Sequence, residues 1–289
     1  SKTPLYFLIG SSVGNVALDY LFVAVFHFGV SGVGWATFLA QGIAGILAVI
    51  TLLRRVAKLP TGHGKVMLYS KSMLRRIAKI AVPSILQQSF VSVGNIFIQS
   101  LVNSFGSAVI AGYSAAIKLN TFTITSFSTL GNALSSFSAQ NIGAAKIDRV
   151  RKGFRAGTML AWIIAVPFFV LFFFFGNEML RIFMENPTGG AMKAGMAFLK
   201  IVSPFYFIIS LKLLADGLLR GSSAMIGFMV STFTDLILRV ILAYVFAGLF
   251  GSTGIWMSWP VGWSISAIIS LLFYRYTWKQ LSVERRLLK

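Results

Sequence analysis

Eight long apolar stretches, separated by short polar or basic segments, dominate the pattern of hydrophobic positions along the chain. A helix needs roughly 20 mostly apolar residues to cross the hydrocarbon core of a bilayer. The stretches cover residues 4–27, 31–53, 80–102, 108–138, 156–177, 194–218, 222–248 and 252–275. The pattern predicts an all-α protein, a polytopic membrane helix bundle with about eight transmembrane helices. Stretch 108–138 is long and polar for one lipid-exposed span, so we expect it to tilt or to extend past the bilayer.

The composition agrees with a chain that lies in a lipid bilayer. Hydrophobic residues make up 56% of the 289 residues and charged residues 11%, whereas a soluble domain carries about a quarter charged residues. The 26 Lys and Arg outnumber the 7 Asp and Glu, for a formal net charge of +19. Because these cations lie between long apolar runs, they indicate cytoplasmic loops of a membrane protein and no nucleic-acid partner.

The basic residues also predict how the spans are oriented. They gather after the even-numbered stretches, most densely in residues 54–79, 146–155 and 275–289, while the alternate loops carry few. Positively charged residues stay on the cytoplasmic side of a membrane. We therefore expect both ends of the chain to be cytoplasmic.

Polar residues inside the third and fourth stretches recur every three or four residues. This spacing places them on one face of each helix. Hydrogen bonds between helices would explain any single Ser or Thr, but amide-bearing stripes on neighbouring helices predict a wet central cavity. Lys118 has no local partner, and it either lines this cavity or pairs with a carboxylate across the bundle. The predicted substrate cavity comprises Gln88, Ser92, Asn95, Gln99, Lys118, Thr121 and Thr125.

Asp19 lies deep in the first stretch, with no Lys or Arg three or four residues away. A bare carboxylate at that depth costs about 2.5–3.5 kcal/mol. Asn15, one turn earlier, and Thr37, on the adjacent stretch, offer an amide and a hydroxyl oxygen, which together with the carboxylate suit a hard monovalent cation. The alternative is a protonated Asp19 hydrogen-bonded to Asn15. We predict that Asn15, Asp19 and Thr37 bind a monovalent cation or a proton.

Two other carboxylates at membrane depth have basic residues one turn away. Asp216 lies between Lys212 and Arg220, and Asp235 precedes Arg239 by four residues. Each can form a neutralising ion pair, so we assign both to structure. Cysteine is absent, and the two histidines are far apart in the sequence. We therefore expect no disulfide, no thiolate metal site and no cofactor.

A faint internal repeat relates the first two stretches to the last two, at an offset of 220 residues. Related halves of this kind occur in membrane transporters, and a complete repeat would place four further spans ahead of Ser1. The pairs at this offset include Gly34 and Gly254, Asn15 and Asp235, and Asp19 and Arg239.

Several motifs resemble those of the multidrug and toxic compound extrusion (MATE) transporters. The AQNIGAAK segment at residues 139–146, with the basic residues that follow it, resembles the loop between the two central helices of the family's C-lobe. Residues 219–221 resemble its LRG turn, and residues 83–88 with 103–106 are similar to its first C-lobe helix. Residues 1–4 look like the end of the matching loop in the other lobe. The resemblance covers the whole chain.

The resemblance implies twelve helices in two six-helix lobes, with this chain lacking the first part. Residues 1–55 would then be the last two helices of the N-lobe, and residues 56–79 a cytoplasmic linker between the lobes. Residues 80–275 would form the six helices of the C-lobe, and residues 276–289 a basic cytoplasmic tail. The location implied is the bacterial inner (plasma) membrane.

The resemblance also implies the activity of an antiporter and not of an enzyme. Family members exchange inward Na+ or H+ for outward movement of bulky, often cationic, small organic compounds, with no obligate protein partner. In one branch, the coupling cation is held by an Asn and an Asp one turn apart, a Thr on the next helix and an Asp on the first helix. Asn15, Asp19 and Thr37 match the first three positions, and the first-helix Asp would lie in the missing part. A second branch uses an acid on the first C-lobe helix, which stretch 80–102 lacks.

Three other functions are compatible with a membrane helix bundle. A lipid-linked oligosaccharide or lipid flippase of the same broad fold family would carry several cavity cations for pyrophosphate, whereas Lys118 is nearly alone here. A membrane-embedded enzyme would need clustered acids or a His-containing constellation, and the sequence has neither. A helical scaffold without transport activity fits the composition equally well.

Overall fold

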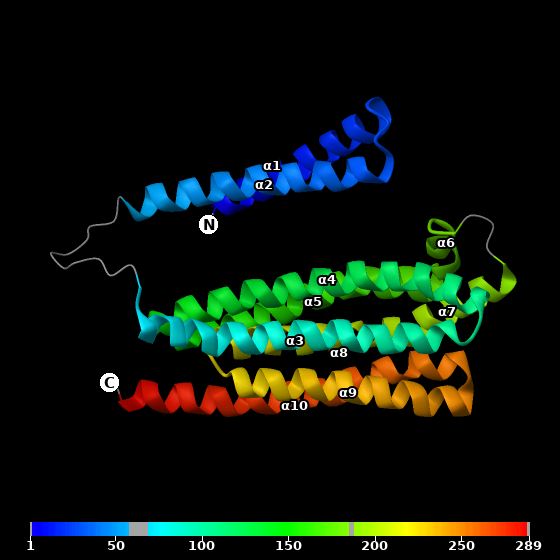
Figure 1. Ribbon diagram of the computed structural model, residues 1–289. Coiled ribbons are helices and arrows are strands. Elements are labelled where there is room, and N and C mark those ends of the chain that lie inside the picture. Colours follow the sequence, from blue (N-terminus) through cyan, green and yellow to red (C-terminus); the bar gives the residue numbers. More distant parts are fainter. Residues whose placement is uncertain (1, 58–68, 185–187, 288–289) are drawn as a thin grey trace. The chain divides into compact units, whose positions relative to one another are not determined.

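The computed structural model describes residues 2–57, 69–184 and 188–287, and the chain divides into two compact units, residues Ser1–Ser70 and Lys71–Lys289 (Figure 1). All regular secondary structure in the described ranges is helical. This confirms the predicted all-α class. Of the predicted linker, residues 58–68 lie outside the described residues.

The first unit is a pair of antiparallel helices. Helix α1 (Lys2–Tyr20) continues into a π-helical turn (Leu21–Val25), and α2 (Gly29–Val56) returns beside it. The chain reverses through Gly29, whose φ of +57° lies in the left-handed region that glycine tolerates. Gly32, Ala36 and Ala40 are the buried residues of α2. Small residues at this spacing let two membrane helices approach closely.

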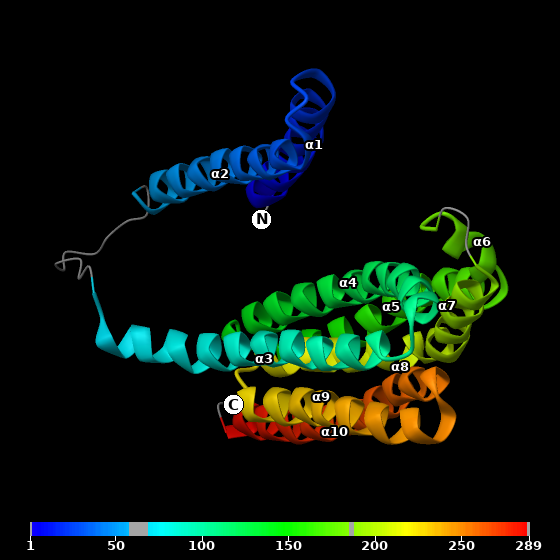
Figure 2. The same cartoon turned by 45° about the vertical axis from the view of Figure 1, so that its right-hand side comes forward.

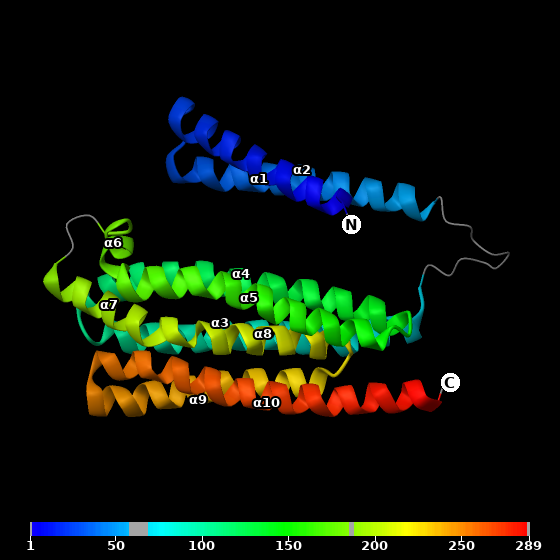
Figure 3. The same ribbon diagram turned by 180° about the vertical axis from the view of Figure 1, so that it is seen from behind.

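The second unit is a bundle of longer helices in three layers. Figures 1, 2 and 3 show α3 and α8 between the α4–α5 pair on one side and the α9–α10 hairpin on the other. The helices are α3 (Lys71–Asn103), α4 (Ser107–Gly143), α5 (Ile147–Phe174), α6 (Gly176–Arg181), α7 (Gly189–Val202), α8 (Tyr206–Gly221), α9 (Met225–Phe250) and α10 (Ser252–Leu287).

Seven helical segments of the described chain are long and apolar enough to cross a membrane. They are Leu5–Val25, Gly29–Val56, Lys71–Asn103, Ile147–Phe174, Gly189–Gly221, Met225–Phe250 and Ser252–Leu281. The eighth predicted stretch forms α4, which is a helix of 37 residues but not one of the seven segments. The polarity noted in the sequence explains this, because α4 packs against α7 and α8 and presents hydroxyl and amide groups to the interior of the unit.

Several helices extend beyond the apolar stretches that predicted them. Helix α3 begins at Lys71 and not at residue 80, α5 begins at Ile147 and not at residue 156, and α10 continues to Leu287. Lys, Arg and Glu are good helix formers, so a helix can continue where membrane-compatible hydrophobicity ends. The basic segments that flank the spans are therefore partly helical. In addition, Ser203–Phe205 forms a 3-10 turn around Pro204, which separates α7 from α8.

Two glycines bring α4 and α8 into backbone contact. A Cβ atom on Gly217 would lie 2.1 Å from the carbonyl oxygen of Gly131, and one on Gly131 would lie 2.6 Å from that of Leu213. Only hydrogen atoms fit between the two helices at this crossing. The crossing holds α8 against α4, so that both helices contribute to the cavity described next.

Candidate functional site

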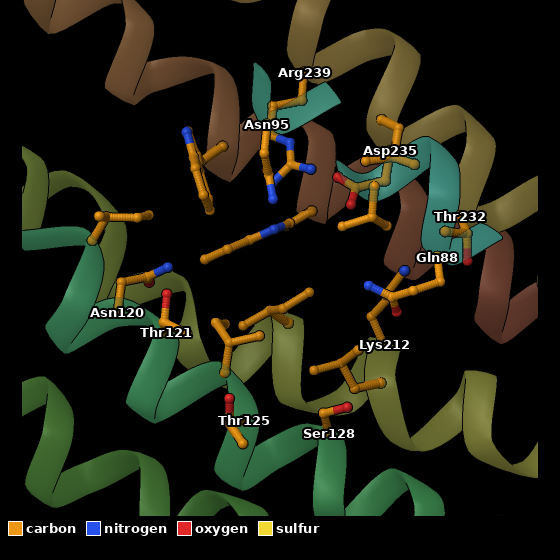
Figure 4. Close-up of a pocket in the computed structure, with 18 of the residues that line it drawn as sticks. Gln88, Asn95, Asn120, Thr121, Thr125, Ser128, Lys212, Thr232, Asp235 and Arg239 are labelled. Atoms are coloured by element: carbon orange, nitrogen blue, oxygen red, sulfur yellow. The ribbon is translucent and has the colours of Figure 1, made fainter. Parts of the chain in front are cut away.

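The second unit contains a cavity of about 470 Å³ among α3, α4, α8, α9 and α10 (Figure 4). Its lining combines amide and hydroxyl groups from α3 and α4 with charged groups from α8 and α9 and with indole rings from α10. The polar and charged lining residues are Gln87, Gln88, Asn95, Gln99, Asn120, Thr121, Thr125, Ser128, Lys212, Thr232, Asp235 and Arg239. The aromatic lining residues are Tyr113, Trp259 and Trp263.

Most of the residues predicted to form the cavity come together in it. The five that line it come from α3 and α4, and they are Gln88, Asn95, Gln99, Thr121 and Thr125. Their role in binding a substrate stays a prediction.

Two predicted residues, Ser92 and Lys118, are not among the lining residues. The Ser92 hydroxyl donates a hydrogen bond to the carbonyl oxygen of Gln88 over 3.2 Å, within its own helix. The Lys118 ammonium lies 5.8 Å from the centre of the Phe183 ring, near the end of α6. It therefore does not line the cavity, and it forms no ion pair with a carboxylate of the described residues.

The aromatic side of the cavity is held by contacts between rings. The Tyr113 ring stacks on Trp256 with ring centres 5.0 Å apart, and Trp259 and Trp263 meet edge to face at 5.6 Å. The buried Tyr206 hydroxyl donates to Asn120 Oδ1 over 3.2 Å, which orients the Asn120 amide on the cavity wall. Flat aromatic surfaces beside oriented amides suit a ligand with an aromatic body.

Asp216 is neutralised inside the protein. The ammonium of Lys212 lies 2.8 Å from Asp216 Oδ2, and both side chains are buried. Ser270 donates to Asp216 Oδ1 over 2.5 Å, and Ser231 contacts both Asp216 Oδ1 and Ser270. The predicted Lys212–Asp216 pair is thus confirmed. Arg220 donates to Asn132 Oδ1 over 2.8 Å, so Lys212 and not Arg220 is the ion-pair partner of Asp216.

The second predicted ion pair, between Asp235 and Arg239, is also wrong. The guanidinium of Arg239 stacks on Trp259, with 4.6 Å between its central carbon and the ring centre. The Asp235 carboxylate lies against α10, where a Cβ on Gly262 would come within 2.8 Å of Asp235 Oδ1. Within the described ranges, neither side chain forms a hydrogen bond or an ion pair. The neighbouring helix α10, and not the i, i+4 spacing, decides where both charges lie.

Asp235 and Arg239 are functional candidates that the sequence assigned to structure alone. With Thr232 they follow one face of α9 at spacings of three and four residues, and all three line the cavity. That spacing was visible in the sequence, but an Asp and an Arg one helical turn apart were interpreted as an ion pair. Figure 4 shows Asp235 and Arg239 extending from α9 into the same space, opposite Asn120, Thr121 and Thr125 of α4.

The predicted cation site lies in the first unit. Asn15 Nδ2 donates a hydrogen bond to Thr37 Oγ1 over 3.3 Å, which joins α1 to α2 at this level. Asp19 Oδ1 is buried and has no hydrogen-bond partner among the described residues, Asn15 included. The structure therefore places all three residues at the contact of α1 with α2. Their binding of an ion stays a prediction.

A helical membrane protein with a polar and aromatic cavity inside its bundle has the architecture of a small-molecule transporter. The sequence profile of the MatE family matches residues 83–245, which is more than half of the chain. This chain belongs to the MatE family. It is a multi-pass membrane protein, and the family resemblance seen in its motifs is confirmed.

Two curated bacterial relatives show how much of a family member this chain represents. It is 30% identical to the probable multidrug resistance protein YpnP of Bacillus subtilis, over 98% of this chain and 63% of that protein. It is 23% identical to the multidrug export protein MepA of Staphylococcus saprophyticus, over 98% of this chain and 62% of that protein. The chain thus spans less than two thirds of the length of the curated relatives it matches.

Solved structures of MATE transporters share the fold. A crystal structure of MATE in the bent conformation aligns with a TM-score of 0.84 at 18% identity, over 97% of this chain and 62% of that one. The outward-facing conformation of a multidrug resistance MATE family transporter of the MOP superfamily aligns with a TM-score of 0.85 at 19% identity, over 96% of this chain and 62% of that one.

Proposed function

We propose that this chain works in an antiporter that uses inward movement of Na+ or H+ to export bulky organic compounds across a bacterial plasma membrane. The names of the relatives, multidrug resistance and multidrug export proteins, support the export of small organic molecules. The single observation that carries the ion coupling is Asp19, an intramembrane carboxylate with a buried oxygen that has no hydrogen-bond partner in the described chain.

The surroundings of Asp19 favour a small ion as its partner. A buried carboxylate is costly unless it is paired, hydrogen-bonded or protonated. Asn15 and Thr37 are bonded to each other beside it and contribute no charge. A proton or a monovalent cation would therefore neutralise Asp19 where no described residue does. Coupling requires that the ion and the exported compound each stabilise a different conformation of the transporter.

The experiment replaces Asp19 by Asn in the protein expressed from its natural gene and reconstituted in lipid vesicles. We expect efflux of a cationic dye driven by a Na+ or H+ gradient to fall to the level of empty vesicles. Asn keeps the shape of the side chain but cannot exchange a proton or supply a negative charge. Glu178→Gln, at an exposed position of α6, is the matched control. Undiminished ion-driven efflux in Asp19→Asn would remove Asp19 from the mechanism.

A second variant separates the two ions. Thr37→Val keeps the volume of the side chain and removes the hydroxyl oxygen that a sodium ion would use. If Na+ is the coupling ion, this variant needs a steeper Na+ gradient for the same efflux. If H+ is the coupling ion, its proton-driven efflux stays at the wild-type level.

A further inference from the structure

A groove of about 610 Å³ lies on the outer surface of the second unit, between α5 and α8, which run side by side (Figure 3). We call it the α5–α8 groove. Its α5 side extends from Arg155 through Met159 and Ile163 to Val166, and its α8 side consists of Phe207 and Leu211. None of these residues lines the cavity among α3, α4, α8, α9 and α10. The groove is therefore a separate feature of the fold, and the proposed export function does not use it.

The length of the α5–α8 groove matches one leaflet of a bilayer. Helix α5 is long and apolar enough to cross a membrane, and Met159, Ile163 and Val166 are 67%, 57% and 48% exposed, so they face hydrocarbon. From Arg155 to Val166 the helix rises about 16 Å, which is about half of a hydrocarbon core of about 30 Å. A hollow of this length accommodates one acyl chain, because an empty gap would forfeit the dispersion contacts of its walls.

One end of the α5–α8 groove is cationic. Arg155 is the charged residue of its lining, is exposed, and forms no ion pair with a described residue. Arg151 lies one turn earlier on the same face of α5. Both belong to the basic segment 146–155, which the positive-inside rule assigns to the cytoplasmic side. The groove therefore combines an accessible cation at the membrane interface with an apolar path into the cytoplasmic leaflet.

The neutral polar groups of the groove are satisfied within the protein. The Thr158 hydroxyl donates to the Phe154 carbonyl oxygen over 2.9 Å, and the Trp162 indole N–H donates to the Phe207 carbonyl oxygen over 3.2 Å. Trp162 thereby fastens α5 to α8 partway along the groove. Its side chain stays 45% exposed, so its ring contacts whatever occupies the groove. Arg155 is thus the lining group that is left for a polar ligand.

We propose that the α5–α8 groove binds an anionic phospholipid, such as phosphatidylglycerol, from the cytoplasmic leaflet. The phosphate would accept hydrogen bonds from the Arg155 guanidinium, and one acyl chain would lie along Met159 and Ile163. Phosphatidylcholine is a weaker ligand, because its quaternary ammonium would lie next to the charges of Arg155 and Arg151. Arginines are common at cytoplasmic helix ends, but at this one a groove of acyl-chain length begins at the guanidinium, so headgroup and chain are recognised together.

The test uses phospholipids with brominated acyl chains, which quench tryptophan fluorescence on contact. The protein expressed from its natural gene is reconstituted in phosphatidylcholine vesicles with increasing fractions of brominated phosphatidylglycerol, and then in the reverse pairing. The quenching of Trp162 is the difference between the wild type and Trp162→Phe. We expect phosphatidylglycerol to occupy the groove about 10-fold more strongly than phosphatidylcholine, the effect of one charge-assisted hydrogen bond.

Variants then assign the preference to the α5–α8 groove. Arg155→Gln should reduce the preference at Trp162 from about 10-fold to about 1, because it removes the charge and keeps a long polar side chain. Arg149→Gln removes the same charge from an exposed position of α5 outside the groove, and it should keep the wild-type preference. Trp35 of α2, which is 58% exposed and far in sequence from any Lys or Arg, should show no preference when measured through Trp35→Phe.

A second readout does not depend on tryptophan fluorescence. Mass spectrometry counts the phosphatidylglycerol molecules that stay bound to the protein through purification in a non-ionic detergent. We expect Arg155→Gln to retain one molecule fewer per protein than the wild type and Arg149→Gln to retain the same number. Circular dichroism and size-exclusion chromatography verify that each variant folds.

Four results would overturn the proposal. They are no quenching of Trp162 by either lipid, which would show that protein covers the groove; equal occupancy by both lipids; a preference that Arg155→Gln keeps; and an equal loss in Arg149→Gln, which would show general attraction to a basic surface. Glycerol 3-phosphate, a headgroup without chains, should leave the quenching unchanged, and recovery of fluorescence with it would count against a lipid. These outcomes are independent of ion-driven efflux, so the test of Asp19 stands apart from them.

Discussion

The hairpins α1–α2 and α9–α10, which the sequence repeat pairs, share a plan but differ in the groups around their acidic residue. Each consists of two antiparallel helices joined at a glycine of positive φ, Gly29 or Gly251, and each carries an aspartate with a buried Oδ1 that lacks a partner in the described chain. Around Asp19 the neighbouring polar groups are neutral. Around Asp235 there are a guanidinium and an indole. The same local feature thus lies beside neutral groups in one hairpin and on the same helix as a cation in the other.

Residues that the repeat pairs do not have the same packing in the two hairpins. The 220-residue offset pairs Gly34 with Gly254, but a Cβ on Gly254 would lie 2.0 Å from the Phe246 carbonyl oxygen, whereas one on Gly34 would meet nothing within 4 Å. In the first hairpin the close approach is made by Gly32, beside Phe22. The π-helical turn of α1 precedes this reversal, so equal spacing in the sequence does not give equal positions in space.

The largest effect is expected from a carboxylate of α8 that contacts the second hairpin. Asp216→Asn removes the partner of the buried Lys212 ammonium, beside Ser231 and Ser270 of the second hairpin. We expect a loss of about 3–5 kcal/mol in the free energy of unfolding, because a buried charge is left unpaired. Asp19→Asn, which breaks no ion pair, should leave it unchanged or raise it, because the variant lacks the cost of a carboxylate without a partner in the described chain. Unfolding in mixed detergent micelles measures both, and equal losses would contradict the comparison.

The next effect tests the two reversals. Gly254→Ala should lower the free energy of unfolding by about 1–3 kcal/mol, because its Cβ would clash with backbone and not with a movable side chain. Gly34→Ala should be neutral or slightly stabilising, since Ala is the better helix former and the space is open. Both variants are measured in the same denaturation assay. A larger loss of stability in Gly34→Ala than in Gly254→Ala would contradict the packing seen in the structure.

The smallest effect concerns the hydrogen bond inside the first hairpin. Thr37→Val removes the acceptor of the 3.3 Å bond from Asn15, and we expect a loss of about 0.6 kcal/mol, the average for such contacts between membrane helices. Ser270→Ala in the second hairpin removes a donor to the Asp216 carboxylate and should cost about 1.5–3 kcal/mol, because that bond is charge-assisted. Similar losses in the two variants would indicate that charge does not distinguish the hairpins.

The sequence predicted only those cavity residues that form a periodic polar pattern along one helix. Gln88, Asn95 and Gln99 recur at helical spacing in an apolar stretch, so their shared face could be recognised before any neighbour was known. Lys118 had no such signal, because its position against Phe183 depends on α6, a short helix that the hydrophobic pattern does not mark. The aromatic side of the cavity could not be predicted either, since Trp259 and Trp263 resemble any other aromatic residue of an apolar span.

The amino-acid sequence by itself determined that this protein is a bundle of membrane-spanning helices, because the length and periodicity of apolar stretches are local properties of the chain. It also determined which helix faces are polar. Only the tertiary structure decided which charges neutralise each other. Asp216 forms an ion pair with Lys212, whereas Arg220 donates to Asn132. Asp235 and Arg239 form no ion pair with each other, because contacts with neighbouring helices outweigh the proximity of side chains one turn apart.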